Sequence, residues 1–336
     1  MSRRKHSSCL TKIFNTIFTF VLVVITAFGI QTYSNVANGA TTLKFAQVSD
    51  DHLSAEKINK GYRLTANSAD LLDDAIEHIN QTPNLDFVFF TGDIIDVPFE
   101  KNMLLFFEHA NKLKYPYYAV PGNHDICIGG YLSKQLYVDL MQKHNKYYKF
   151  NKTYYSFVPK TGFKVIGLDN IIDTRLTANG ELSQEQLDFL DKELANAGDN
   201  IVLIFMHVPL LQPFTSDNHR LLNADKMQQI LSKYKMPIGV FAGHYHTTKV
   251  RRLNDNIVHV STPALISYPN AFRIVTVQNY KNKAVFNITY TPTRLLELQK
   301  KAKLLVFHSS TYYGSEADRT VKITIEKRSK WQTNLK

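Results

Sequence analysis

Five short segments supply most of the side chains in this chain that could bind a divalent metal together. They offer carboxylates, a carboxamide and imidazoles, a mixed set that suits manganese, iron, zinc or cobalt better than calcium. The segments are Asp50-Asp51-His52, Gly92-Asp93-Ile94-Ile95-Asp96, Gly122-Asn123-His124-Asp125, His207 and Gly243-His244-Tyr245-His246.

The spacing within these segments indicates how two ions could be held. Asp50 and His52 are two residues apart and can bind one ion, to which His246 can return. Asp93 is placed to bridge both ions. The second ion would take its remaining ligands from three residues, Asn123, His207 and His244. Two ions about 3.5–4 Å apart activate a bridging water or hydroxide and neutralise phosphoryl oxygens, so the set predicts phosphate-ester hydrolysis.

Such a hydrolysis also needs a group that stabilises or protonates the leaving oxygen. His124 stands next to the ligand Asn123 and can point into the site. Asp125 can orient and charge that imidazole. We therefore expect His124 and Asp125 to act as a pair that assists the leaving group.

Apolar runs and helical periodicity predict the elements that must position these residues. Most of the metal-binding segments directly follow a β-prone run, so the ends of several strands should converge on one place. Strands are expected at 44–48, 87–90, 117–120, 163–168, 201–206, 238–241, 257–260, 271–277 and 284–290, and helices at 68–80 and 99–113. A further helix should begin at Ser183 with Gln186 in a capping box. Strands that alternate with helices indicate an α/β fold.

Read in order, the segments follow the pattern D-x-H, G-D-x-x-D, G-N-H-D, an isolated His and G-H-x-H. In this the chain resembles the calcineurin-like metallophosphoesterase superfamily, over about residues 43–290. The resemblance implies a four-layer α/β/β/α sandwich with a dinuclear metal site at the C-terminal ends of its strands. It also implies the seven metal ligands and the catalytic pair named above, with Asp93 shared between the ions.

Two further features narrow the resemblance. Residues 180–190 are similar to a helix start in the branch that contains class III cyclic nucleotide phosphodiesterases and acid-phosphatase-like enzymes. Asp96 stands where purple acid phosphatases carry a metal-binding Tyr, so a purple enzyme is not expected. Two roles stay open for Asp96: a direct catalytic role, or a carboxylate that accepts hydrogen bonds from loop amides. Asp51 is expected to be exposed.

The first 40 residues have the layout of a secretory signal peptide or an N-terminal membrane anchor. Basic residues come first, the apolar stretch 13–30 follows, and small residues come at 37–40. Both alternatives place the catalytic domain, residues 41–290, outside the cytoplasm, either periplasmic, secreted or membrane-anchored. Residues 291–336 are expected to form a C-terminal appendage with a basic amphipathic helix at 295–304 and a strand at 320–326, which packs on the sheet or touches a membrane.

Composition limits the classes of partner. The chain has 336 residues, of which 44% are hydrophobic and 21% charged, as in folded globular proteins. Its net charge of +11 suits a small phosphorylated substrate, but the Lys residues are scattered, so no nucleic-acid partner is expected. The two cysteines, Cys9 and Cys127, leave the domain without an internal disulfide, since Cys9 lies in the leader.

The leading hypothesis is therefore an exported hydrolase of phosphomonoesters or phosphodiesters that uses two ions, with manganese, iron or zinc favoured. A cyclic nucleotide phosphodiesterase and a membrane lipid-phosphate hydrolase are the alternatives within this class, and a metal-binding scaffold without turnover is the alternative outside it. Loops at 126–155, 208–226 and 261–272 are expected to select the substrate. The other histidines match no ligand position and are expected on the surface or packed: His109, His144, His219, His259 and His308.

Overall fold

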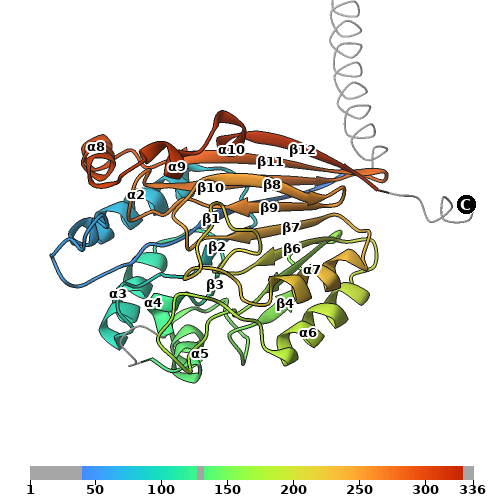
Figure 1. Ribbon diagram of the computed structural model, residues 1–336, viewed down its shortest axis with the longest axis horizontal. Helices are drawn as coiled ribbons and strands as arrows, with labels where there is room; N and C mark the ends of the chain where they lie inside the picture. The colour runs from blue at the N-terminus through green and yellow to red at the C-terminus, as the bar shows by residue number, and fades with distance from the viewer. Residues whose placement is uncertain (1–39, 127–131, 328–336) are drawn as a thin grey trace, which may run out of the picture. The chain divides into compact units, whose positions relative to one another are not determined.

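The computed structural model of the chain describes residues 40–126 and 132–327, and it contains there two six-stranded sheets (Figure 1). In the order β12-β11-β10-β1-β2-β3, the first sheet comprises Val321–Glu326, Lys283–Pro292, Ala271–Asn279, Thr41–Val48, Phe87–Thr91 and Tyr117–Val120. In the order β4-β5-β6-β7-β9-β8, the second comprises Tyr155–Phe157, Phe163–Gly167, Ile201–Phe205, Ile238–Ala242, Ile257–Ser261 and Lys249–Asn254.

Each sheet has a parallel part. Strands β1, β2 and β3 run parallel in the first sheet, and β5, β6, β7 and β9 run parallel in the second. Antiparallel strands extend both sheets: β11 and β12 beyond β10, β4 beside β5, and β8 beside β9. Neighbouring parallel strands end at the same edge of their sheet, so the segments that follow β1, β2, β3, β6 and β7 begin close together.

Aromatic side chains fill the space between the two sheets. Phe45 of β1 contacts Phe205 of β6 and Phe241 of β7, with ring centroids 5.4 and 5.2 Å apart. Phe89 of β2 stacks on Phe205 at 3.9 Å. All four rings are fully buried, and burial of each is worth about 1.5–3 kcal/mol. The sheets therefore pack face to face.

Helices cover the other face of each sheet. Phe90 of β2 contacts Phe106 of α3 (Glu100–Ala110), with ring centroids 5.1 Å apart. In the second sheet, Val202 and Ile204 of β6 belong to an apolar cluster that includes the buried face of α6 (Gln184–Ala195). Successive residues of a strand point to opposite faces, so these contacts lie outside the aromatic layer. The predicted order of helix, sheet, sheet and helix is confirmed.

The expected helices and strands are present, with ends that shift by a few residues. The helix expected at 68–80 is α2, Ser68–Gln81, and the strand expected at 117–120 is β3. The patterns did not predict β4, β8, or the helices α5 (Lys134–His144) and α7 (Ala224–Ser232). β4 has three residues, and β8 is polar and partly exposed, so neither has the apolar run that identified the other strands.

The start of α6 differs from the predicted capping box in one half. The Ser183 side chain accepts a hydrogen bond from the backbone N–H of Gln186, as expected. The Gln186 side chain does not return to Ser183, because it pairs with the backbone of Asp169 instead. It accepts from the Asp169 N–H at 2.9 Å and donates to the Asp169 carbonyl at 2.5 Å. Gln186 thus joins α6 to the end of β5.

The described part of the C-terminal segment, up to residue 327, contains α8 Leu296–Leu305, α9 Ser309–Tyr313, α10 Glu316–Arg319 and β12. β12 pairs with β11 and so forms an edge of the first sheet, which is one of the two placements expected for residues 291–336. The buried guanidinium of Arg273 donates to the carbonyls of Ser261, Asp318 and Arg319. One side chain of β10 therefore ties α10 to β9.

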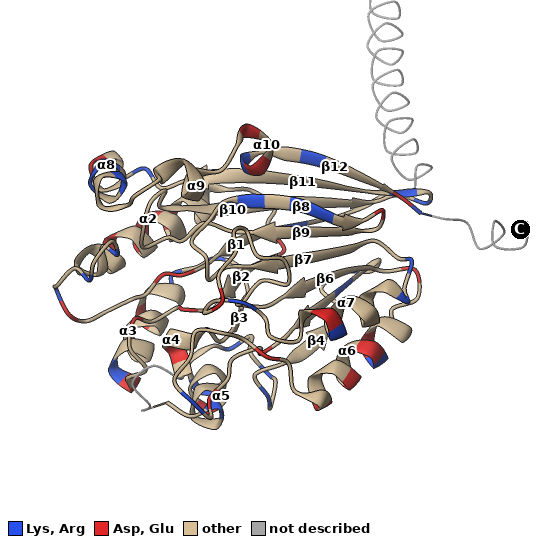
Figure 2. Ribbon diagram, in the orientation of Figure 1, with Lys and Arg blue, Asp and Glu red and all other residues tan. Residues whose placement is uncertain are grey.

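The predicted leader, apart from Ala40, lies outside the described residues, as does Cys127. Among the helices of the described ranges, none is long and apolar enough to cross a membrane. Basic and acidic residues are interspersed along the ribbon, as Figure 2 shows for α6, α7 and α8.

Candidate metal centre

The first group of candidate ligands combines the end of β1 with the loop after β7. Ligand atoms of Asp50, His52 and His246 lie within 4.8 Å of one another, and all three residues are buried. His246 Nε2 is 3.4 Å from Asp50 Oδ1, while its Nδ1 is 2.8 Å from the hydroxyl of Ser267. Ser267 therefore fixes the ring so that Nε2 faces the carboxylate. His246 lowers the pKa of Asp50 to about 2, although burial alone would raise it.

The second group combines the ends of β2, β6 and β7. Ligand atoms of Asp93, His207 and His244 also lie within 4.8 Å of one another. His207 Nε2 is 3.3 Å from Asp93 Oδ2, 3.2 Å from Asn123 Oδ1 and 3.1 Å from His244 Nδ1. His207 Nδ1 lies 2.8 Å from the carbonyl of Thr91, so it is placed to donate there. His207 Nε2 therefore faces side-chain atoms of three other candidate ligands, Asp93, Asn123 and His244.

Asp93 lies between the two groups. Its Oδ2 is 3.3 Å from His207 Nε2 and 3.6 Å from His52 Nε2, and its Oδ1 accepts from the backbone N–H of His124 at 2.7 Å. Asp93 thus faces ligand atoms of both groups.

A metal ion fits this donor set better than hydrogen bonds alone. Buried acceptors that face one another repel unless a cation or a proton lies between them. Burial lowers the pKa of His207, but the Asp93 carboxylate outweighs this and raises it to about 9, so this buried cluster attracts positive charge. His52 Nε2 is buried and has no hydrogen-bond partner among the described residues. The residues present therefore suit the two ions that the ligand pattern implies.

The backbone bends sharply at five of the candidate ligands. Their φ angles are positive, in the left-handed region that most residues avoid: Asp50 56°, His52 43°, Asp93 50°, His244 71° and His246 54°. Glycines let these bends pack closely. A Cβ at Gly122 would collide with Asp93, and one at Gly243 would collide with Ser49. The Gly of the G-N-H-D and G-H-x-H patterns is thus required by space.

His124 lies at the first group, but Asp125 does not hold it. The backbone carbonyl of Asp96 is 2.7 Å from His124 Nδ1 and so accepts its proton. Both Asp125 oxygens accept from backbone N–H groups, of Ile95 at 3.0 Å and of Gly122 at 2.7 Å. The expectation that Asp125 orients the imidazole is corrected here: Asp125 ties together the loops after β2 and β3, and burial raises its pKa to about 7.

Sequence reasoning missed a cationic cluster beside the first group. Asp96 Oδ2 is 2.6 Å from Lys60 Nζ, and Asp96 Oδ1 is 3.4 Å from Arg63 Nη1. The carboxylate of Asp96 is thus paired with cations, not with loop amides. Lys60 and Arg63 belong to the loop between β1 and α2, which contains no recognisable motif. The hydrogen bond from the Leu64 N–H to the Ile266 carbonyl holds the end of this loop against the segment before Ser267.

Asp51 was expected to be exposed, and this was wrong. The residue is 1% exposed, and its two oxygens have no partner among the described residues. The chain turns inward after β1 because Asp50 and His52 must reach the site, and Asp51 is carried with them. Burial raises its pKa well above the ordinary value.

Side chains from the predicted specificity loops reach the site. His219, in the loop 208–226, lies with its ring 5.3 Å from that of His244. Phe214 of the same loop is partly exposed and contacts Tyr245 at 5.0 Å. On the other side, Tyr62 contacts the His246 ring at 5.7 Å. Aromatic rings therefore flank both groups of ligands.

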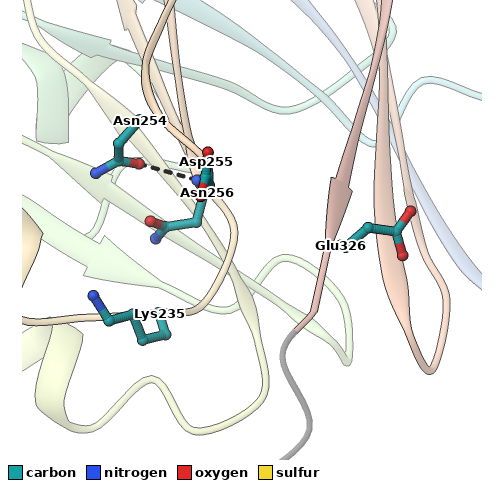
Figure 3. Close-up of a pocket in the computed structure, with 5 residues that line it drawn as sticks. All are labelled: Lys235, Asn254, Asp255, Asn256 and Glu326. Carbon is teal, nitrogen blue, oxygen red and sulfur yellow. Dashed lines mark hydrogen bonds between the residues drawn. The ribbon is translucent and has the colours of Figure 1, made fainter. Parts of the chain in front are cut away.

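A separate polar hollow lies away from this centre, at the N-terminal ends of β7 and β9 (Figure 3). It is lined by Lys235, Asn254, Asp255, Asn256 and Glu326. Asn256 Nδ2 donates to the carbonyls of Tyr234 and Met236, so this side chain serves the turn before β7. None of the candidate metal ligands contributes to this hollow.

The sequence is similar to one family of known proteins. The sequence profile described as "Calcineurin-like phosphoesterase" matches residues 43–248. A probable glycerophosphodiester phosphodiesterase, GpdQ, of Arcobacter nitrofigilis is 30% identical over 221 residues, which are 63% of this chain and 75% of the relative. The 3',5'-cyclic adenosine monophosphate phosphodiesterase CpdA of Haemophilus influenzae is 24% identical over 66% of this chain and 76% of its own length.

A solved structure supports the fold. The dimetal phosphatase from Danio rerio aligns with a TM-score of 0.56 and 19% identity, over 75% of this chain and 99% of that one. At this identity the likeness concerns the fold: two sheets with helices outside, as described above.

Proposed function

Because the chain belongs to the calcineurin-like phosphoesterase family and is a hydrolase of phosphoester bonds, we propose that it is an exported phosphodiesterase that uses two metal ions. The observation that carries this proposal is the meeting of seven candidate ligand side chains, with Asp93 between the other six. We propose manganese, iron or zinc for the ions, which suit ligands that mix imidazoles and oxygens.

The residues would divide the work as follows. Asp50, His52 and His246 would hold one ion, Asp93 would be shared, and the other ion would be held by three residues, Asn123, His207 and His244. When bound, two such ions supply an activated water and neutralise phosphate oxygens. His124 lies beside the first group, with its Nδ1 fixed by the Asp96 carbonyl, and would assist departure of the leaving oxygen. Asp125 would hold the loops in place.

The preference for diesters is supported by the relatives. The relatives described above are named as phosphodiesterases of glycerophosphodiesters and of cyclic AMP. We therefore place phosphodiesters first, with cyclic nucleotides among them, and phosphomonoesters second.

A substrate panel tests this proposal. The full chain, loaded in turn with manganese, iron or zinc, is given bis(p-nitrophenyl) phosphate, 3',5'-cyclic AMP, a glycerophosphodiester and p-nitrophenyl phosphate. We expect at least one diester to be hydrolysed with a kcat/KM about tenfold or more above that of the monoester. His124→Ala should lower kcat by about 10²–10⁴-fold, the usual contribution of a proton-transfer group. Turnover no higher than that of His124→Ala would contradict the proposal.

A lipid phosphodiester is the second candidate. Leu304 in α8 and Phe307 just after it are 88% and 90% exposed, and Lys300 and Lys301 precede them in the sequence. Exposed apolar side chains next to basic ones suit an anionic membrane surface. Sedimentation with vesicles containing phosphatidylglycerol should retain the wild-type chain at low salt and release Leu304→Ser/Phe307→Ser, whereas equal binding of both would exclude this surface.

Export is supported by the leader pattern at residues 1–40. Cell fractionation should find the full chain outside the cytoplasm and a chain lacking residues 1–40 inside it. Equal distribution of the two chains would contradict export.

A further inference from the structure

The guanidinium of Arg63 lies between a candidate metal ligand and the candidate leaving-group residue. Its Nη1 is 3.3 Å from His52 Nδ1 and 3.1 Å from His124 Nε2. The same atom is 3.4 Å from the Asp96 carboxylate. The side chain is about one fifth exposed, so it borders both the buried site and solvent.

The contacts of the two imidazoles define what Arg63 does there. His124 Nδ1 donates to the Asp96 carbonyl, so His124 Nε2 is left to accept from Arg63. His52 Nδ1 faces Asp96 Oδ1 at 3.7 Å, and its Nε2 faces Asp93 at 3.6 Å. Arg63 therefore contributes a permanent positive charge at the edge of the site without displacing a ligand.

Most of the guanidinium remains available. Within the described residues, the side-chain hydrogen bonds and the ion pair of Arg63 all involve Nη1. Nε and Nη2 have no partner in that part of the chain, and a guanidinium presents its N–H groups in a planar fork that matches two phosphate oxygens. Lys60, which also pairs with Asp96, has no hydrogen bond to either imidazole among the described residues.

We propose that Arg63 binds the non-reacting oxygens of the substrate phosphate, next to His124. This rests on the proposed function, since the anion it takes is the phosphate group of the substrate. Asp96 positions Arg63 by pairing with it, and at the same time positions His124 through its backbone carbonyl. One residue thus aligns the group that binds the phosphate and the group that assists the leaving oxygen.

Phosphate binding tests this directly. The affinity of the manganese-loaded full chain for inorganic phosphate is measured by calorimetry, and bound metal is counted in the same samples. Arg63→Gln should weaken phosphate binding by about tenfold or more, because a charged hydrogen bond is lost. Arg63→Lys keeps the charge but loses the fork, so it should fall between the wild type and Arg63→Gln.

Lys60→Gln is the matched control, since it removes one positive charge from the same carboxylate. It should change phosphate affinity by less than about twofold, and all variants should keep the metal content of the wild type. Wild-type phosphate affinity in Arg63→Gln, or loss of metal in that variant, would overturn the proposal. If Arg63→Gln does not fold, Arg63→Lys decides the question by the same two measurements.

The role of Arg63 and the proposed phosphodiesterase activity can fail independently of each other. A chain that binds phosphate through Arg63 but hydrolyses no ester would contradict only the phosphodiesterase proposal. A chain that hydrolyses diesters while Arg63→Gln binds phosphate normally would contradict only the role of Arg63.

Discussion

Asp93 is the side chain on which both candidate metal sites depend. Replacement by Asn should lower bound metal from two ions per chain to fewer than one, because a neutral amide cannot compensate two cations. The fold should survive, since Asn can still accept from the His124 N–H. His246→Gln should remove only the ion next to Asp50, since the His246 ring contacts that side.

Metal analysis of the purified full chain, loaded to saturation and then desalted, measures this prediction. Two ions per chain in Asp93→Asn would contradict the shared role. Loss of both ions in His246→Gln would show that the two sites do not fill independently.

The buried His259 should make the folded protein less stable in mild acid. It is buried, and its Nε2 accepts from the Leu211 N–H at 3.4 Å. Burial, helped by Arg251, lowers its pKa to about 3. The unfolded chain, with a pKa of about 6.5, binds a proton that the folded chain refuses. The free energy of unfolding should therefore fall as the pH drops below about 6.5, by about 1.4 kcal/mol per unit.

Urea unfolding at pH 7.0 and 5.5 measures this slope. In His259→Gln, whose side chain cannot titrate, the free energy of unfolding should fall less over this pH range, by up to about 1.4 kcal/mol per pH unit. An equal slope in both proteins would show that His259 does not contribute.

At the residue scale the sequence predicted which side chains lie together at the candidate metal centre. It did not predict which groups form hydrogen bonds or ion pairs with them. The ligands carry recognisable types in a recognisable order, and the strands before them are apolar runs. Arg63 could not be predicted, because its position depends on how the loop between β1 and α2 returns to Ile266. Asp125 was placed near the site correctly and given the wrong contact, since adjacency to His124 in sequence does not fix which way each side chain turns.

Gln186 joins α6 to the end of β5, so it should contribute more to the free energy of unfolding than an ordinary helix cap does. Gln186→Ala would leave the Asp169 N–H and carbonyl buried without a partner. Each such group costs about 1–3 kcal/mol, so the free energy of unfolding should fall by about 2–6 kcal/mol. Ser183→Ala removes only the cap and should cost about 1 kcal/mol.

Chemical denaturation of both variants separates these effects. Equal losses would mean that the bond between α6 and β5 adds nothing beyond capping.

Elements were predictable where one physical signal dominated. α6 has a capping Ser and an apolar face of Leu187, Leu190 and Leu194, and it was found. β8 was missed because it forms an edge through pairing with β9, and its side chains are largely polar. Such a strand depends on a neighbour that is not visible in local sequence.

Over the whole molecule, Arg273 links parts that are distant in sequence. It donates to carbonyls in β9 and α10 from a fully buried position, where burial lowers its pKa to about 9. Arg273→Met should lower the free energy of unfolding by roughly 3 kcal/mol or more, because several buried carbonyls lose a charged donor. It should also expose the segment 294–327 to trypsin.

Arg252→Met is the matched control, because Arg252 donates to the Thr324 carbonyl at the exposed surface of the same C-terminal segment. Its loss should cost less than about 1 kcal/mol. Equal protease sensitivity of the two variants would contradict the special role of Arg273.

The left-handed backbone at Asp50, His52, Asp93, His244 and His246 has a consequence for engineering. Residues with a Cβ in this region typically cost on the order of 1 kcal/mol or more, and Gly would relieve that cost. A selection for heat resistance that ignores turnover would therefore be drawn to these positions. The substitutions it favoured would remove ligands one by one, and the resulting protein would be robust and inert.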